Sequence, residues 1–183
     1  MDDLDQEFFA RDTLTVAREL LGVKLIYKEC AGIIVETEAY RDDEASHAVT
    51  RPKTGGMLRT TYGQVYIYLV YGMYHCLNFT TEKHGVGAVL VRAVEPVAGL
   101  SKMHERRKPA RGKNLTNGPG KLFQAFGLQP VHHGEVVGRS IRLVVVPNNG
   151  RPDIATSPRI GISKAKELEW RFFIKGNPYV SKP

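Results

Sequence analysis

The segment from Gln64 to Thr81 is the part of this 183-residue chain that most limits its fold. Two runs rich in β-branched and aromatic residues, 64–71 and 74–81, are separated only by a short link that contains Gly72. A link of this length with a glycine is typical of a β-hairpin, because glycine reaches the positive φ angles of a tight turn at little cost. The chain is therefore expected to contain an antiparallel sheet.

The remaining sequence predicts further strands, helices and loops. Apolar runs indicate five more strands, at residues 23–27, 33–40, 87–94, 141–146 and 170–174. A turn is expected at 30–32, and Pro96 is expected to end the strand that starts at Gly87. Helical spacing with cap and stop signals indicates helices within 12–22, 97–107 and 118–127, and a short basic helix after Ile162. Residues 147–158 are expected to be loop, and residues 41–61 a long functional loop with room for one helical turn.

About seven strands with hairpin links and interspersed helices predict an α+β fold built on an antiparallel sheet. Strict alternation of strands and helices, which would indicate a doubly wound fold, is absent. A chain of 183 residues suits one domain, 1–183, with a substantial core. Hydrophobic residues make up 42% and charged residues 25%, so the composition is that of a globular protein and not of a disordered one.

The charge balance and the cysteines limit the partners and the compartment. A formal net charge of +7 favours a polyanionic partner such as nucleic acid, although membrane-surface proteins share this property. No apolar run approaches the roughly 20 residues that span a bilayer, and the acidic start Met1–Asp5 is unlike a signal peptide. Cys30 and Cys76 form no CxxC pair. We therefore expect an intracellular, monomeric protein with reduced thiols and no membrane partner.

Metal-dependent and covalent mechanisms find little support in the sequence. No HExxH, GxSxG, GxxxxGK[ST] or GxGxxG motif is present. Glu44 lies three residues before His47, which is a weak metal-ligand signal without further ligands. The amides of Gly118–Lys121, at a helix start, could meet a phosphate, but simple capping explains them equally well. No metal and no cofactor are expected.

Two carboxylates follow a buried run. Glu36 and Glu38 come directly after Ile33–Val35, and the period of a strand places both carboxylates on the same face. They repel each other unless a cation lies between them, and Arg92 on another strand is a possible partner. Glutamates of strands are usually exposed and paired, but the apolar run indicates burial. A carboxylate at a buried strand end beside Tyr40 is a reasonable general base.

Aromatic residues gather at the predicted hairpin. Tyrosines in strands usually pack in the core or across strands, which is the simplest explanation here. Their number and position around a tip that also carries Met73 favour a second interpretation. On a basic protein, such rings suit stacking on nucleic-acid bases or insertion between them. The tyrosines in question are Tyr62, Tyr66, Tyr68, Tyr71 and Tyr74.

Several motifs together resemble one enzyme family. They are Ile34-Val-Glu-Thr-Glu-Ala-Tyr40, a His seven residues further on, Tyr66-x-Tyr68-x-x-Tyr71-Gly-Met-Tyr-x-Cys76-x-Asn78, Val91-Arg-Ala-Val-Glu-Pro96 and Asn114-Leu-Thr-Asn-Gly-Pro-Gly-Lys-Leu122. In this order, over about residues 8–181, they resemble the alkyladenine (3-methyladenine, methylpurine) DNA glycosylases. The resemblance implies a monofunctional hydrolase that releases alkylated or deaminated purines from double-stranded DNA in base-excision repair. It also implies a curved, barrel-like antiparallel sheet flanked by helices, with a protruding hairpin.

The resemblance assigns roles to individual residues. Glu38 would activate the water that attacks C1′, and Glu36 would be a structural or salt-bridging neighbour. Tyr40 and Tyr68 would stack on the flipped base, His47 would bond the base or its sugar-phosphate, and Asn78 would select against the exocyclic amine of guanine. Arg92 would hold the DNA backbone or orient the carboxylate. Tyr71, with Met73, would intercalate from the hairpin tip.

One segment departs from the family pattern. The loop between His47 and Met57 is a few residues shorter, and Pro52-Lys-Thr-Gly-Gly56 replaces a more Arg-rich stretch. Arg51, Lys53 and Arg59 could supply DNA contacts instead. Two rival interpretations stay open at this point: a non-catalytic module that binds damaged DNA or RNA on the same scaffold, and a metal-dependent hydrolase that uses Glu44 and His47.

Overall fold

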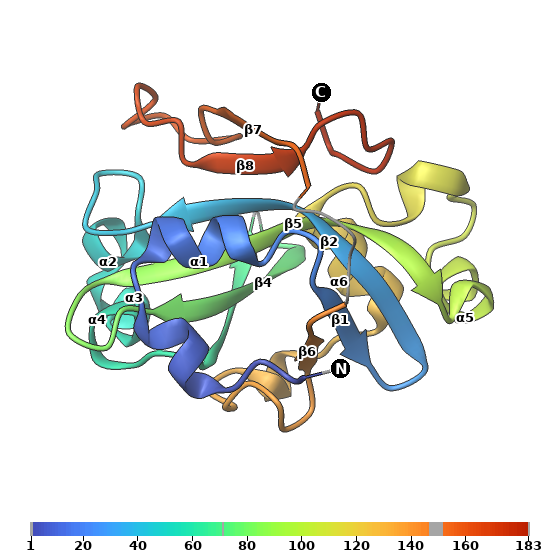
Figure 1. The fold of residues 1–183 in the computed structure, drawn as a ribbon, viewed down its shortest axis with the longest axis horizontal. Helices are drawn as coiled ribbons and strands as arrows, with labels where there is room; N and C mark the ends of the chain where they lie inside the picture. The colour runs from blue at the N-terminus through green and yellow to red at the C-terminus, as the bar shows by residue number, and fades with distance from the viewer. Residues whose placement is uncertain (1, 71, 147–151, 183) are drawn as a thin grey trace.

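The computed structural model describes residues 2–70, 72–146 and 152–182 (Figure 1). Its strands are β1 (Lys24–Tyr27), β2 (Cys30–Tyr40), β3 (Val65–Val70), β4 (Tyr74–Thr81), β5 (Gly87–Ala98), β6 (Arg142–Val144), β7 (Ile154–Ser157) and β8 (Arg171–Ile174). Its α-helices are α1 (Thr13–Glu19), α2 (His47–Thr50), α3 (Pro52–Gly55), α4 (Met57–Thr60), α5 (Leu100–Arg106) and α6 (Pro119–Phe126). Three 3₁₀ turns are η1 (Gln6–Ala10), η2 (Gly112–Leu115) and η3 (Pro130–His132).

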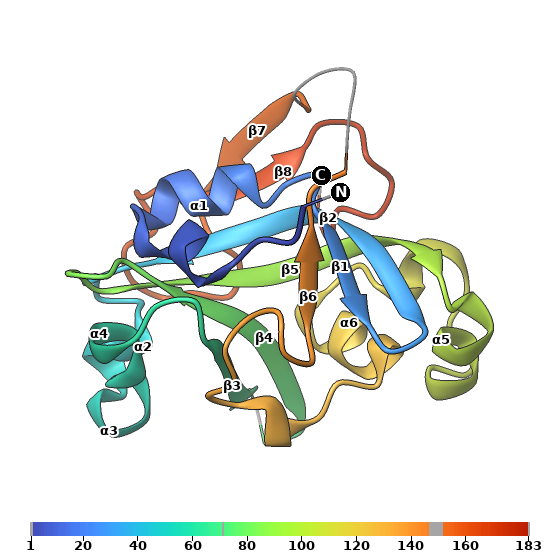
Figure 2. The same ribbon diagram turned by 60° about the horizontal axis from the view of Figure 1, so that its bottom comes forward.

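Strand β2 is the centre of the sheet. One of its edges pairs with β5 over most of its length, while the other edge pairs first with β1 and then with β8. The main path of the sheet runs β3-β4-β5-β2-β1-β6, β7 adds to β8, and every pair is antiparallel. The expected mixed fold on a curved antiparallel sheet is confirmed, but this sheet stays open, with β3 and β6 at the ends of its path (Figure 2).

The two faces of the sheet have different surroundings. Thr37 and Ala39 of β2 face the main core, where Thr37 Oγ1 donates to the Ala17 carbonyl of α1 over 2.8 Å. Helix α1 packs on β2 and β5, and α6 packs on β4 and β5. The intervening side chains of β2, Glu36 and Glu38, are also fully buried and lie away from this core. Short helices α2–α4 gather at one end of the molecule and α5 at the other (Figures 1 and 2).

The signals for two of the predicted helices, α1 and α6, are confirmed by local geometry. The Asp12 carboxylate caps α1 by accepting from the Thr15 amide over 2.9 Å, and Gly22, at φ +88°, ends this segment. Pro119 occupies the first turn of α6, where its missing N–H is not needed, and Gly127 closes that helix at φ +70°.

Five local predictions were wrong. Residues 41–61 hold three short helices instead of one helical turn, and β2 already begins at Cys30, so the turn lies at 28–29. Pro96 does not end β5, because it lies opposite Gly32 at a register irregularity, where a missing donor is tolerated.

The helix after Ile162 is absent from the described residues, since positive φ at Gly161 and Ala165 interrupts it. Part of the expected 147–158 loop is β7, while 147–151 lie outside the described residues.

Candidate active site

A cavity of about 560 Å³ opens on the face of the sheet that points away from the main core. Its walls come from strands β2 to β5, from helices α2 and α4 with the residues before α2, from the start of α6, and from the segment that follows β7. It has the size of a small-ligand pocket rather than of a packing defect. The lining residues include Tyr40, His47, Arg51, Tyr66, Tyr68, Cys76, Asn78, Leu90, Arg92 and Ile160–Ser163.

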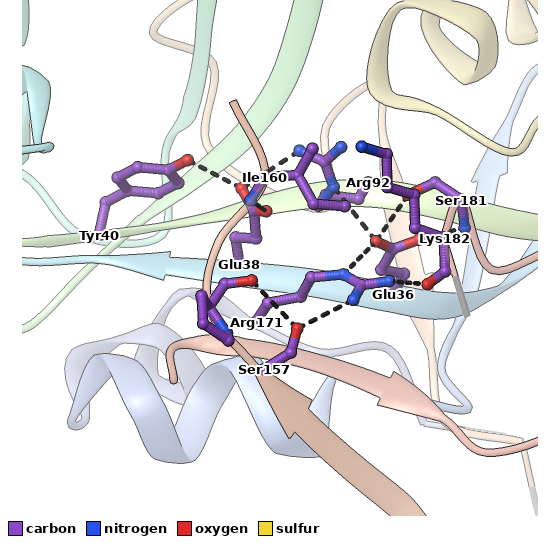
Figure 3. A network of polar contacts seen from close by, with 10 residues as sticks. Glu36, Glu38, Tyr40, Arg92, Ser157, Ile160, Arg171, Ser181 and Lys182 are labelled. Carbon is purple, nitrogen blue, oxygen red and sulfur yellow. Dashed lines mark hydrogen bonds and ion pairs between the residues drawn. The ribbon is translucent and has the colours of Figure 1, made fainter. Parts of the chain in front are cut away.

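Glu38 has no exposed surface, and its carboxylate contacts three residues that line this cavity, Tyr40, Arg92 and Ile160 (Figure 3). Its Oε1 accepts the Ile160 amide over 2.7 Å. Its Oε2 accepts the Tyr40 hydroxyl over 2.8 Å and pairs with Arg92 Nη1 at 3.2 Å. A carboxylate offers about four acceptor positions, of which these contacts use three. One position therefore remains for a water molecule, and the charge is held by donors in fixed places.

Arg92 joins the two glutamates of β2. Its Nε donates to Glu36 Oε1 over 3.2 Å while Nη1 reaches Glu38. Burial lowers the pKa of Arg92, but the charges of Glu38 and Glu36 outweigh this and raise it, so the guanidinium stays charged. The predicted partnership between Arg92 and the carboxylate pair is present in the structure.

Aromatic rings form one side of the cavity. Tyr68 lies 5.6 Å from Tyr66 and 4.3 Å from His47 between ring centroids, and His47 Nδ1 bonds the Tyr66 hydroxyl at 2.9 Å. Burial, helped by the charge of Arg51, lowers the pKa of His47 to about 4, so this imidazole is neutral at pH 7. Burial and the charge of Glu38 raise the pKa of Tyr40 well above its ordinary value, which keeps its hydroxyl a donor to Glu38.

Asn78 and Cys76 line the cavity from β4. Both donor positions of the Asn78 amide are used on backbone carbonyls, those of Tyr66 at 3.0 Å and Cys76 at 3.3 Å. The side-chain carbonyl, an acceptor, is what Asn78 can offer a ligand. Burial raises the pKa of Cys76 to about 11, so its thiol stays protonated and unreactive.

The hairpin tip carries the two residues for which intercalation was predicted. Met73 is 67% exposed and follows Gly72, whose φ of +71° fits a tight turn. Strands β3 and β4 pair up to Val70 and Tyr74, so the tip is reached through regular antiparallel pairing. Tyr71 lies outside the described residues. An exposed methionine on a paired hairpin is a suitable group for contact with a ligand.

Sequence reasoning missed the segment 159–163. Arg159 is buried, and its guanidinium makes two bonds to Asp43, at 2.7 and 3.1 Å, and one to the Ala39 carbonyl at 3.0 Å. It also lies over the rings of Tyr40 and Trp170, 4.7 and 5.2 Å from their centroids. These contacts place Ile160 over Glu38. The only signal in the sequence was the Pro158–Arg159 pair after a loop, and a long-range partner such as Asp43 cannot be read from it.

The site therefore unites the predicted residues. Tyr40, His47, Tyr68, Asn78 and Arg92 line one cavity, and Glu38 is bonded to three lining residues, Tyr40, Arg92 and Ile160. Glu44, the other half of the possible metal pair, lies at the rim and pairs with Lys164 at 3.9 Å, whereas His47 bonds Tyr66. A flat ligand held against rings, above a carboxylate with one free acceptor position, is a geometry suited to hydrolysis. No helix of the described residues is long and apolar enough to cross a bilayer.

Comparison with known proteins gives one family. The family model of methylpurine-DNA glycosylase (MPG) matches residues 7–178. A Salinibacter ruber protein named "Putative 3-methyladenine DNA glycosylase" is 41% identical over 99% of this chain and 97% of its own length. Proteins of the same name from Rhizobium etli and Chlorobaculum tepidum are 46% and 42% identical, over 96% and 100% of this chain and 87% and 92% of their own.

Proposed function

Since this chain belongs to the methylpurine-DNA glycosylase family, we propose that it hydrolyses the N-glycosidic bond of alkylated or deaminated purines in double-stranded DNA. Residues 1–183 would act as one glycosylase domain and as a monomer. The observation that carries the proposal is Glu38, a fully buried carboxylate bonded to three residues that line a cavity of about 560 Å³. A module that only binds nucleic acid does not need a charge buried at such a place.

The reaction needs a nucleotide outside the base stack, since C1′ is unreachable inside a duplex. A water molecule at the free acceptor position of Glu38 would attack C1′ of the extruded nucleotide. Its oxygen bonds to C1′, one proton passes to Glu38, and the electron pair of the C1′–N bond leaves with the purine. The product is a free base and an abasic site. No lysine lines the cavity among the described residues, which fits hydrolysis without a Schiff base or strand cleavage.

The walls of the cavity would recognise the base. Tyr68 and Tyr40 would stack on it, and a cationic alkylpurine is attracted to such rings. His47, neutral at pH 7, would bond the base or the sugar-phosphate without adding a charge that repels a cationic base. The free group of Asn78 is an acceptor, which would attract an exocyclic amine electrostatically. Exclusion of guanine by Asn78 would therefore be steric, through the closeness of β4 to the base.

Arg92 would act on Glu38 through their contact and could reach the DNA backbone from the cavity wall. At the shortened 48–56 segment, Arg51 lines the cavity and remains available for a phosphate. Arg59 is engaged with Asp42 over 2.6 Å, at an exposed site. Arg51 and the exposed Lys53 are therefore the cations of that segment that we assign to DNA.

The proposal is tested by incubating the chain with duplex oligonucleotides that each carry one lesion, 3-methyladenine, 7-methylguanine, hypoxanthine or ethenoadenine, and by analysing for free base. We expect base release from at least one lesion and no strand break before alkali treatment. Binding of every lesion without release would instead support the non-catalytic module. Activity abolished by a chelator and restored by a metal would support the metal-dependent alternative with Glu44 and His47.

A change at the hairpin tip should act only on duplex substrates. Stacking of an aromatic ring on a base contributes about 1–3 kcal/mol, so Tyr71→Ala is expected to lower affinity for lesion duplex roughly 5- to 100-fold. Met73→Ala should have a smaller effect in the same direction, as its side chain is exposed at the hairpin tip but carries no aromatic ring. The measurement is binding and single-turnover release on duplex and on single-stranded lesion DNA. Equal losses on both substrates would contradict insertion into the stack, because a single strand leaves no gap to fill.

A further inference from the structure

Glu36 takes no part in the proposed reaction, yet it accepts four hydrogen bonds, one more than the three contacts of Glu38. It has no exposed surface. Its Oε1 accepts from Arg92 Nε at 3.2 Å, Arg171 Nε at 2.7 Å and Ser181 Oγ at 2.8 Å. Its Oε2 accepts the Ser181 amide at 2.6 Å. Four donors from three separate segments therefore meet on one buried side chain (Figure 3).

The donors tie distant parts of the chain to β2. Arg171 belongs to β8 and also donates through Nη1 to Ser157 of β7 at 2.9 Å. Its Nη2 donates to the carbonyl of Lys182 in the C-terminal segment. Ser181 lies in that same segment. Ser181 is thus held against Glu36, from which it is 145 positions away in the sequence, and Lys182 is bonded to Arg171.

The charges of this cluster balance. Glu36 and Glu38 contribute two negative charges and Arg92 and Arg171 two positive ones, and Arg92 is shared, with Nε on Glu36 and Nη1 on Glu38. A guanidinium normally binds one carboxylate with two parallel bonds. Because Glu36 engages Nε, Arg92 gives Glu38 only one contact, and an acceptor position of Glu38 stays open.

We infer that Glu36, fixed by Arg171 and Ser181, is a positioning residue that sets how Arg92 contacts the proposed catalytic Glu38. This inference rests on the proposed function. Without Glu36, Arg92 would turn fully onto Glu38, cover its free position and increase the positive potential there. Without Arg171, Glu36 would draw Arg92 to itself, and the positive potential at Glu38 would fall. Loss of Glu36 and loss of Arg171 therefore change the positive potential at Glu38 in opposite directions.

The other groups around Glu38 do not reproduce this pair of effects. Tyr40 donates its hydroxyl to Glu38. The charge of Glu38 adds to the effect of burial in raising the pKa of Tyr68 and of Cys76. All three are neutral at pH 7, since burial raises the pKa of each above its ordinary value. Arg159 is compensated by Asp43. The potential at Glu38 can therefore be changed through the charges of Glu36, Arg92 and Arg171, and not through these other groups.

The test measures single-turnover base release against pH, on the lesion that the wild type releases fastest. For Glu36→Gln we expect a plateau roughly 10- to 100-fold lower, because small displacements of catalytic groups cost this much. The acid limb is the low-pH part of the profile, where base release falls. It should move to lower pH in Glu36→Gln and to higher pH in Arg171→Met, each by about one unit. Arg171→Lys keeps the charge and should return the limb toward the wild-type position.

Two further variants separate positioning from folding. Ser181→Ala removes one neutral donor, should fold, and should lower the plateau several-fold. Asn177→Ala removes a 2.8 Å contact between the same C-terminal segment and Glu95 but leaves both bonds of Ser181 to Glu36 in place, so it should leave release unchanged. The inference is overturned if Glu36→Gln and Arg171→Met both keep the acid limb at the wild-type pH and their rates follow melting temperature alone. The proposed function would then still stand. A wild type that releases no base overturns the proposed function and this role with it.

Discussion

Glu38→Gln is expected to lower single-turnover base release by roughly 10²–10⁴-fold, the usual contribution of a general base. The amide has almost the shape of the carboxylate, so the cavity and its rings should be preserved. It cannot take a proton from water, and one of its two acceptor atoms becomes a donor that faces the donors Ile160 N–H or Tyr40 O–H. Affinity for lesion duplex, measured by fluorescence anisotropy, should change only a few-fold.

The control for this variant is Glu38→Asp. Glu38→Gln removes one charge from a buried cluster of two glutamates and two arginines, so some loss of stability is expected. Aspartate keeps that charge but withdraws the carboxylate from the cavity, so it should retain more stability and still release base slowly. Near-normal release by Glu38→Gln, in a folded protein, would exclude Glu38 as the base.

Local signals in the sequence were sufficient for the residues that lie on regular strands. The alternation along β2 predicted that Glu36 and Glu38 share a face, and Arg92 of β5, named as a possible partner, contacts both in the structure. The same alternation put Tyr66 and Tyr68 together on one wall. Period two is a local property of extended backbone, so pairing with the correct neighbour was enough to assemble these side chains.

Long-range contacts explain what the sequence could not show. Each of the three helices within 47–60 is a single turn, below the length at which propensity or hydrophobic period gives a signal. The side chains of Arg159 and Arg171 are held by Asp43 and Glu36, which lie 116 and 135 residues away. Their burial depends on these partners and not on their neighbours in sequence. An arginine beside loop residues is ordinarily exposed, which is why both were missed.

Arg159→Met is expected to cause the largest loss of stability among single changes near the site. The side chain of Arg159 has no exposed surface and that of Asp43 only 7%, and the pair is bidentate. Removal of one partner of a buried pair leaves a charge without compensation and costs about 3–5 kcal/mol. For a domain of this size the melting temperature should fall by on the order of 10 °C, as measured by calorimetry or circular dichroism.

The exposed pair Arg59–Asp42, with a contact of 2.6 Å and side chains 42% and 59% exposed, is the matched control. Arg59→Met should change stability by less than about 1 kcal/mol, because water already solvates both charges. The double variant Asp43→Asn with Arg159→Met should recover part of the loss, since no charge is then left buried. A single Arg159→Met variant as stable as the Arg59→Met variant would contradict the argument. Base release should fall in Arg159→Met even well below its melting temperature, because Ile160, which donates its amide to Glu38, then loses the anchor of the adjacent residue to Asp43 and Ala39.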